Sequence, residues 1–83
     1  MEKILVSVYV VSLQTRYDLF IPMMLTMQEL AQLIANGLVE LTNGRYEPSG
    51  KEMLCLKEPP TLLHQQRTPE DFALRNGDEL VLY

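Results

Sequence analysis

The segment TPEDFALRNGDELVLY, from Thr68 to Tyr83, contains a helix start, a tight turn and a strand in immediate succession. The tetrapeptide Thr68–Asp71 is typical of a helix N-terminus, because a threonine hydroxyl caps the first turn and proline favours its first position. Asn76-Gly77-Asp78 is turn chemistry, which leaves room for a single helical turn before it. The apolar run Leu80–Tyr83 follows Glu79, and we predict a final strand over Glu79–Tyr83.

The N-terminal part of the chain predicts a hairpin. Residues 3–11, KILVSVYVV, are rich in β-branched side chains and predict a first strand. The even-numbered positions of this strand are all aliphatic, so we place Ile4, Val6, Val8 and Val10 on the face toward the core. Residues 17–21, YDLFI, predict a second strand, and the five residues between the two strands suit a hairpin connection.

Pro22 ends the second strand, and a helix start follows it. Thr26 and Glu29 have the spacing of a capping box, in which the threonine side chain accepts from the glutamate amide and the carboxylate returns the bond. Apolar residues then recur at steps of three and four, at Met27, Leu30, Ala31, Ile34, Leu38 and Leu41. We therefore expect a helix over residues 27–41, with Gly37 tolerated inside it at a cost of about 1 kcal/mol.

The remaining elements complete an α+β fold. Residues 42–52 contain Asn-Gly, Ser-Gly and a proline, so we expect the longest and most mobile loop there. In residues 53–57 two leucines alternate with the other side chains, which predicts a third strand. Residues 61–63 are too short for more than an edge strand. The order is two strands, a helix, a strand, a short strand, a one-turn helix and a last strand, which predicts a mixed sheet of four or five strands packed on one helix. If the first and last strands pair, they run parallel at its centre.

Strand parity and helical spacing together predict one hydrophobic core. Its expected members are Ile4, Val6, Val8, Tyr17, Leu19, Ile21, Leu30, Ile34, Leu54, Leu56, Leu74, Leu80 and Leu82.

Length and composition exclude several classes of protein. The 83 residues fit one domain, residues 1–83, and 47% apolar with 22% charged residues are globular values. A net charge of −4 disfavours binding to nucleic acid phosphates. The apolar runs are far shorter than the roughly 20 residues that cross a bilayer, so we expect no membrane insertion. No signal peptide is visible and Cys55 is the one cysteine, which favours a cytoplasmic location.

Candidate catalytic and metal-ligating residues are few. A nucleophilic cysteine needs a base or a positive charge beside it, and the one histidine, His64, lies in a different segment from Cys55. One cysteine and one histidine cannot supply the four ligands of a structural zinc site. The acid pairs Glu70-Asp71 and Asp78-Glu79 fit structural roles at a helix start and a turn. We therefore expect no enzymatic activity, no catalytic residue, no metal and no cofactor.

These elements resemble the ubiquitin-like β-grasp superfamily over essentially the whole chain. Thr68–Tyr83 is similar to the superfamily pattern of a capped helical turn, an aliphatic residue, a Gly-Asp turn and a Leu-x-Leu strand. Within the superfamily the chain is most similar to the small bacterial YukD/EsaB group, whose members are encoded with type VII (ESX-like) secretion systems. The residues that carry this similarity are Tyr17-Asp18-Leu19, Pro22, the Thr26 region and Asn76–Leu80.

The chain departs from the family pattern at Ala73. Many relatives have glycine or asparagine at this position, where the chain can turn left-handed. Either Ala73 accepts a strain of about 1–2 kcal/mol, or the loop runs differently.

The resemblance implies a non-conjugated protein-interaction module that serves as a cytoplasmic accessory or regulatory component of a bacterial type VII secretion system. Conjugation and sulfur transfer need a C-terminal Gly-Gly tail, and this sequence ends in Leu80–Tyr83 inside the expected strand. A modifier or sulfur-carrier role is therefore disfavoured if the 83 residues are the natural length. The other alternative is a ubiquitin-like domain of a larger protein.

The predicted sheet has an outward face that we expect to bind a protein partner. Parity opposite to the core places Leu5, Ser7, Tyr9, Phe20, Cys55, Val81 and Tyr83 on it. The partner-binding candidates are Leu5, Tyr9, Phe20, Cys55, Val81 and Tyr83, with Arg75 as a charge at the rim. Met23 and Met24, in the link before the helix, are a second candidate contact, unless they pack under the helix end. Secretion-system proteins, or a second copy in a homodimer, are the partners that we consider.

Overall fold

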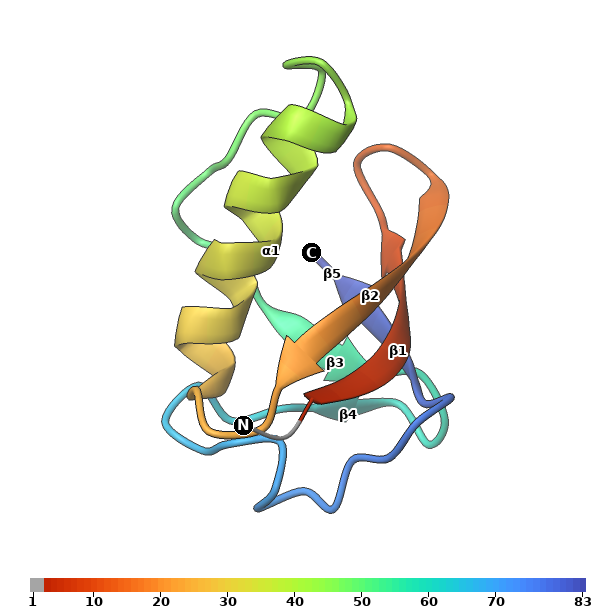
Figure 1. Ribbon diagram of the computed structural model, residues 1–83, viewed down its shortest axis with the longest axis vertical. Coiled ribbons are helices and arrows are strands. Elements are labelled where there is room, and N and C mark those ends of the chain that lie inside the picture. The colour runs from red at the N-terminus through yellow and green to blue at the C-terminus, as the bar shows by residue number, and fades with distance from the viewer. Residues whose placement is uncertain (1–2) are drawn as a thin grey trace.

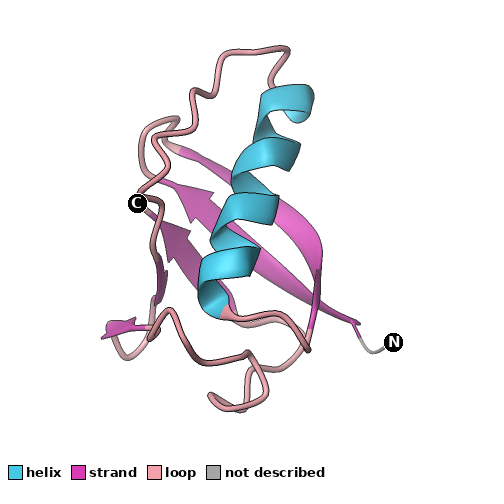
Figure 2. Cartoon of the chain, turned by 90° about the vertical axis from the view of Figure 1, so that its left-hand side faces the viewer, coloured by secondary structure: helices cyan, strands magenta, loops and turns pink. Residues whose placement is uncertain are grey.

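A five-stranded sheet curves around one α-helix in residues 3–83, which the computed structural model describes (Figure 1). The elements follow the order β1 (Lys3–Val10), β2 (Thr15–Pro22), α1 (Met27–Leu41), β3 (Leu54–Leu56), β4 (Thr61–Leu62) and β5 (Glu79–Leu82). Figure 2 shows α1 lying across one face of the sheet, so the other face is left uncovered. This arrangement confirms the predicted α+β fold.

The sheet has the strand order β2-β1-β5-β3-β4, with β1 and β5 near its centre. β1 pairs antiparallel with β2 and parallel with β5, while β3 lies antiparallel to β5 and to β4. The predicted parallel pairing of the first and last strands is therefore confirmed. β2 begins at Thr15, two residues earlier than expected, because the hairpin turn is tighter than the sequence indicates.

Helix α1 has the predicted bounds and the predicted capping box. The Glu29 N–H donates to Thr26 Oγ1 at 3.2 Å, and the Thr26 N–H donates to Glu29 Oε1 at 2.9 Å. The buried side of the helix ends at Leu38, so Leu41 lies outside the core although it continues the predicted apolar spacing. Leu41 is 58% exposed, because the last turn extends past the core and turns this side chain toward the side of β2.

One core lies between α1 and the sheet, and it contains the predicted residues. Nine of them are buried, namely Val6, Val8, Ile21, Leu30, Ile34, Leu54, Leu74, Leu80 and Leu82. The other four, Ile4, Tyr17, Leu19 and Leu56, are partly buried and pack against the same cluster. Tyr46 and Leu63 also belong to the core, although both come from segments that the sequence marks as loop or edge.

The predicted one-turn helix after Thr68 is a series of tight turns instead. Its start is as expected, since the Thr68 N–H donates to Asp71 Oδ2 and the Asp71 N–H donates to Thr68 Oγ1. The next bonds join residues three apart, as in the Ala73 N–H to the Glu70 carbonyl at 3.0 Å. Ala73 then adopts a left-handed conformation with φ of 54°, which stops helix growth. Of the two alternatives that the sequence leaves open, the structure therefore has the one in which Ala73 accepts the strain.

The long segment between α1 and β3 is anchored at both ends. Thr42 Oγ1 donates to the Leu38 carbonyl and accepts from the Tyr46 N–H, so the helix end and the loop share one hydroxyl. Further along, the buried Glu52 carboxylate accepts from the Tyr46 hydroxyl at 3.0 Å and from the Ser49 N–H at 2.7 Å. A buried carboxylate therefore organises a loop for which the sequence predicts no fixed structure.

Candidate functional site

The face of the sheet that points away from α1 is the candidate functional site, and we call it the outer face. Tyr9 on β1 lies opposite Val81 on β5, and Val81 lies opposite Cys55 on β3. Cys55 in turn lies opposite Leu62 on β4. Because residues directly opposite each other share one face of a sheet, these four side chains form a line across four strands. We call this line the Tyr9 row.

The predicted outer-face residues are accessible to different degrees. Phe20 and Tyr83 are 69% and 64% exposed, whereas Leu5 and Tyr9 are 38% and 36% exposed. Cys55 and Val81 are half-buried. Leu62, which the sequence marked only as part of a short edge strand, is 56% exposed and extends the Tyr9 row. Its place opposite Cys55 depends on the pairing of β4, which the sequence does not define.

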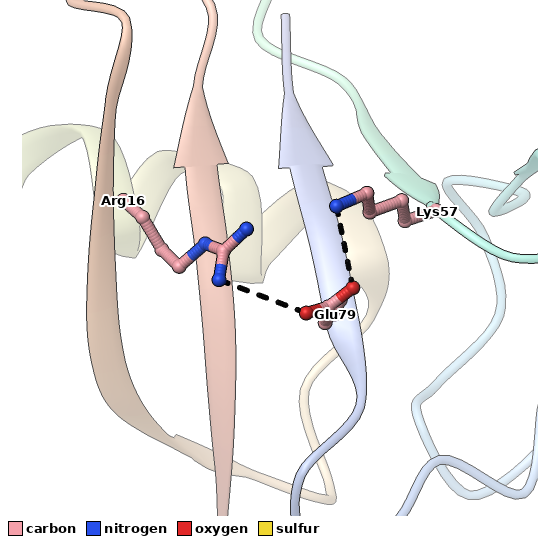
Figure 3. Close-up of polar contacts among 3 residues, drawn as sticks. All are labelled: Arg16, Lys57 and Glu79. Atoms are coloured by element: carbon pink, nitrogen blue, oxygen red, sulfur yellow. Dashed lines mark ion pairs between the residues drawn. The ribbon is translucent and has the colours of Figure 1, made fainter.

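A charged cluster crosses the outer face, and the sequence prediction did not include it. Arg16 on β2 reaches over β1 toward Glu79 on β5, and Lys57 approaches Glu79 from the other side (Figure 3). The Arg16 Nη1 to Glu79 Oε1 distance is 3.7 Å, and the Lys57 Nζ to Glu79 Oε2 distance is 3.4 Å. Since Glu79 lies opposite Ser7, between Leu5 and Tyr9 along β1, the cluster separates the Leu5–Phe20 pair from the Tyr9 row.

The turn before β5 is bound to the rim of the outer face. The Leu5 N–H donates to Asn76 Oδ1 at 2.7 Å, and the Gly77 N–H donates to the Leu5 carbonyl at 2.8 Å. Arg75 lies at the start of this turn and is exposed, as expected for a charge at the rim. The side chain of Asp78 accepts from the Arg75 N–H, which fixes the main chain of the turn beneath the exposed guanidinium.

The two methionines lie apart from the Tyr9 row, in the link between β2 and α1. Met24 is 72% exposed, while Met23 is half-buried. Leu25 packs against the core, so it is the residue of this link that lies under the helix end. Met24 therefore offers a flexible apolar contact at this end of the molecule.

Cys55 and His64 do not form a nucleophile–base pair in the described part of the chain. Burial raises the pKa of the Cys55 thiol, which favours the protonated, unreactive form. His64 uses Nδ1 to accept from the Gln66 N–H at 3.1 Å. Within residues 3–83, no group of three or more His, Cys, Asp or Glu side chains is arranged to hold a metal ion.

Two surface hollows lie at the edges of the sheet, and each is lined in part by one outer-face residue, Phe20 or Leu62. One, of about 130 Å³, lies between β2 and α1 and is lined by apolar residues that include Leu19, Leu33 and Leu41. The other, of about 280 Å³, lies beside β4 and is lined by residues that include Met53 and His64. Gly37 is one of the residues that line the first hollow, and a Cβ built on it would have no atom within 4 Å.

Comparison with protein-family models finds no match, and comparison with curated proteins finds none. Solved structures do match. The ubiquitin-like domain of the type VII secretion system protein ECCD1 from Mycobacterium tuberculosis has a TM-score of 0.73 at 16% identity, covering 99% of this chain and 98% of that one. The EccD5 ubiquitin-like domain from Mycobacterium xenopi has a TM-score of 0.71 at 17% identity, covering 100% and 94%. A ubiquitin-like domain from Arabidopsis thaliana has a TM-score of 0.70 at 19% identity, covering 100% and 78%.

These likenesses, together with the sheet order and the single covered face, define the fold as a ubiquitin-like β-grasp. Because the sequence identities are low, these similarities show the fold alone. Among residues 3–83, no helix has the length and apolar content that a membrane crossing requires.

Proposed function

We propose that this chain is a non-conjugated ubiquitin-like module that binds protein partners through its outer face and performs no catalysis. The observation that carries the proposal is the uncovered sheet face with the Tyr9 row on it. Tyrosine gives a large contact area with a polar tip, and aromatic residues are enriched among the residues that dominate binding. The charged cluster beside the row supplies orientation more than affinity.

We further propose that the module is a cytoplasmic accessory or regulatory component of a bacterial type VII secretion system, of the YukD/EsaB kind. The sequence motifs favour this group, and two of the similar structures are ubiquitin-like domains of EccD proteins, one of them from a protein described as part of a type VII secretion system. The partner is then a component of the secretion machinery. Gene order tests this placement, because such a chain should be encoded beside an FtsK/SpoIIIE-type membrane ATPase and small WXG proteins.

A ubiquitin-like domain of a larger protein is the second candidate. The similar structures are described as ubiquitin-like domains, and the chain covers 78% of the Arabidopsis thaliana structure. An isolated gene without secretion genes beside it would favour this candidate over the secretion-system role. A modifier or sulfur-carrier role is the least favoured, and an unchanged intact mass after incubation with a cognate activating enzyme would exclude it.

Binding to the cytosolic part of that ATPase tests the docking proposal. The double variant Tyr9→Asp, Val81→Lys changes two members of the Tyr9 row and leaves the net charge unchanged. We expect an unchanged circular dichroism spectrum and melting curve, and binding at least about tenfold weaker by calorimetry, equivalent to about 1.4 kcal/mol. The matched control is Ser12→Asp, Gln32→Lys, at two exposed positions outside the outer face. Equal binding by both double variants, or unfolding of the first, overturns the proposal.

A further inference from the structure

The two edges of the sheet differ in length. β4 forms one edge with only Thr61–Leu62, whereas β2 forms the other edge from Thr15 to Pro22 and is paired with β1 alone. A long unpaired edge presents a row of free N–H and C=O groups that can pair with another strand. The β2 edge is therefore the place where this sheet can be extended.

The hydrogen bonds of β1 determine which residues of β2 face this edge. The Ser7 N–H donates to the Asp78 carbonyl, on the β5 side. Successive residues of a strand bond to opposite neighbours, so the even-numbered residues of β1 bond to β2. Val6 lies opposite Leu19, and the odd-numbered residues of β2 thus bond to β1.

Three residues consequently direct their main-chain N–H and C=O groups to the free edge: Arg16, Asp18 and Phe20. Their side chains lie on the outer face. Arg16 and Asp18 carry opposite charges two residues apart, so the edge is complementary to an antiparallel copy of itself. A two-fold axis at Tyr17 places Arg16 opposite Asp18 of the second copy, and Asp18 opposite its Arg16. Both are hydrogen-bonded pairs that exchange two main-chain bonds each.

Other antiparallel registers of the same edge are less favourable. A two-fold axis at Asp18 would oppose two carboxylates, which is destabilising in a sheet. An axis at Leu19 would place both charges opposite apolar or proline residues, and Pro22 has no N–H to donate. With the two-fold axis at Tyr17, each charged residue lies opposite a residue of the other charge. The same register places Tyr17 opposite Tyr17 of the second copy, and aromatic cross-strand pairs stabilise a sheet.

The charges within one copy are incompletely paired. Glu79 shares both Arg16 and Lys57, while Asp18 has no ion-pair partner among residues 3–83. In the Tyr17 register, Arg16 can pair with Asp18 of the second copy while Lys57 continues to neutralise Glu79. Each carboxylate then has a cation of its own.

We propose that this chain forms a two-fold dimer in which β2 pairs antiparallel with β2 of a second copy, with Arg16 opposite Asp18 of that copy. The two sheets join into one, and both outer faces lie on the same side of it. Dimerisation therefore duplicates the Tyr9 row without covering it. The proposal stands apart from the docking of other proteins, because the Tyr9→Asp, Val81→Lys variant leaves the β2 edge intact.

Two single charge reversals test the pairing, and each is studied alone and in an equimolar mixture. Arg16→Glu alone sets two carboxylates opposite each other in both pairs, and Asp18→Arg alone sets two guanidinium groups opposite each other. Each variant should therefore dimerise at least about tenfold more weakly than the natural sequence. In the equimolar mixture, a heterodimer sets the two carboxylates of the Arg16→Glu chain opposite the two guanidinium groups of the Asp18→Arg chain. The mixture should therefore associate more strongly than either variant alone.

The double variant Arg16→Glu, Asp18→Arg supplies the rescue, because it exchanges the two charges and restores both opposite-charge pairs in a homodimer. Sedimentation velocity should show the natural sequence and the double variant shifting from 9.6 kDa toward twice that mass as concentration rises. Each single variant alone should remain monomeric under the same conditions, whereas the equimolar mixture of the two should shift toward the dimer mass.

Lys51→Glu and Glu47→Arg are the matched controls, because they make the same charge changes at exposed loop positions and should leave dimerisation unchanged. Both edge positions are exposed, so circular dichroism should show folded variants. A natural sequence that stays monomeric at millimolar concentration overturns the proposal. The proposal is also overturned if both single variants dimerise as strongly as the natural sequence. It is overturned as well if the double variant folds but associates no better than the single variants.

Discussion

The Tyr46 hydroxyl donates a 3.0 Å hydrogen bond to Glu52 Oε2, and this bond joins the two halves of the loop between α1 and β3. Burial, followed by the hydrogen bond to Glu52 and its charge, raises the pKa of Tyr46 to about 12. Burial opposes ionisation of Glu52, but the Ser49 and Gly50 N–H groups and the Tyr46 hydroxyl outweigh it and hold the pKa of the carboxyl below its ordinary value. The pair therefore favours a charged glutamate beside a neutral tyrosine.

Glu52→Gln should lower the free energy of unfolding by about 1–3 kcal/mol at pH 7, because buried donors lose their charged acceptor. The pKa of Glu52 is lower in the folded state than in the unfolded one. Its contribution is therefore complete above the ordinary carboxyl range and is lost as the pH falls through the folded pKa. Urea unfolding of both proteins should show a difference that narrows in acid. If the difference in free energy of unfolding did not change with pH, the charge of the Glu52 carboxylate would not be what stabilises the loop.

Tyr46→Phe should remove a loss of stability at alkaline pH. The unfolded tyrosine ionises near 10.0 while the folded one ionises at about 12, so the stability of the natural sequence should decline as the pH rises through this window. The phenylalanine variant should be about 1–3 kcal/mol less stable at neutral pH and flatter above pH 10. Urea unfolding measures the free energy of unfolding as a function of pH. If it declined equally in the two proteins above pH 10, burial of the Tyr46 hydroxyl would be contradicted.

Ala73→Gly should stabilise the protein by about 0.5–1 kcal/mol. The left-handed φ of 54° strains a residue with a Cβ, and glycine relieves that strain at some cost in unfolded-state entropy. Gly77→Ala is the matched control, because Gly77 has a φ of 91° and should respond in the opposite direction. Thermal unfolding distinguishes the two. Destabilisation by Ala73→Gly would mean that the turn after Pro69 does not adopt this conformation.

Gly37→Ala should raise the free energy of unfolding by about 1 kcal/mol. Gly37 lies inside α1, where alanine has the higher helix propensity, and a Cβ built on it has no atom within 4 Å. Urea melts measure the change. No gain, or a loss, would mean that the hollow between β2 and α1 is already closed by a neighbouring side chain.

Truncation of core residues should be costly. Leu80 and Ile34 are 1% and 5% exposed and lie on β5 and α1, the two layers that meet in the core. Leu80→Ala or Ile34→Ala should each lower the free energy of unfolding by about 2–5 kcal/mol. A loss below about 0.5 kcal/mol in urea melts would show that the strand register or the helix face is wrong.

Local chemistry and periodicity predict much of this fold, because the decisive contacts lie close in sequence. The Thr26–Glu29 capping box and the alternation of β1 depend on neighbouring residues, and both are confirmed. Tyr46 and Leu63 were missed as core residues, since their burial depends on how loops return to the helix and sheet. The apolar spacing continues to Leu41 although the buried side of the helix ends at Leu38, because helical spacing alone does not show where the core ends.

The candidate site was predictable in part for the same reason. Strand parity placed Tyr9 and Val81 on the face away from α1, and their direct opposition follows from the parallel pairing of β1 with β5. Glu79 bridges Arg16 on β2 and Lys57, the residue after β3, and no local pattern in the sequence indicates these contacts. The open hollow at Gly37 likewise requires the packing of α1 against β2.

The most direct measurement for the docking face is an NMR titration of the ¹⁵N-labelled chain with the unlabelled cytosolic part of the ATPase. We predict that the amide signals of Tyr9, Cys55 and Val81, and of their neighbours along β1, β3 and β5, change most. The signals of α1 and of the 42–53 loop should remain in place. Changes confined to Leu33, Gly37 and Leu41, around the hollow between β2 and α1, would contradict the assignment of the outer face as the partner surface.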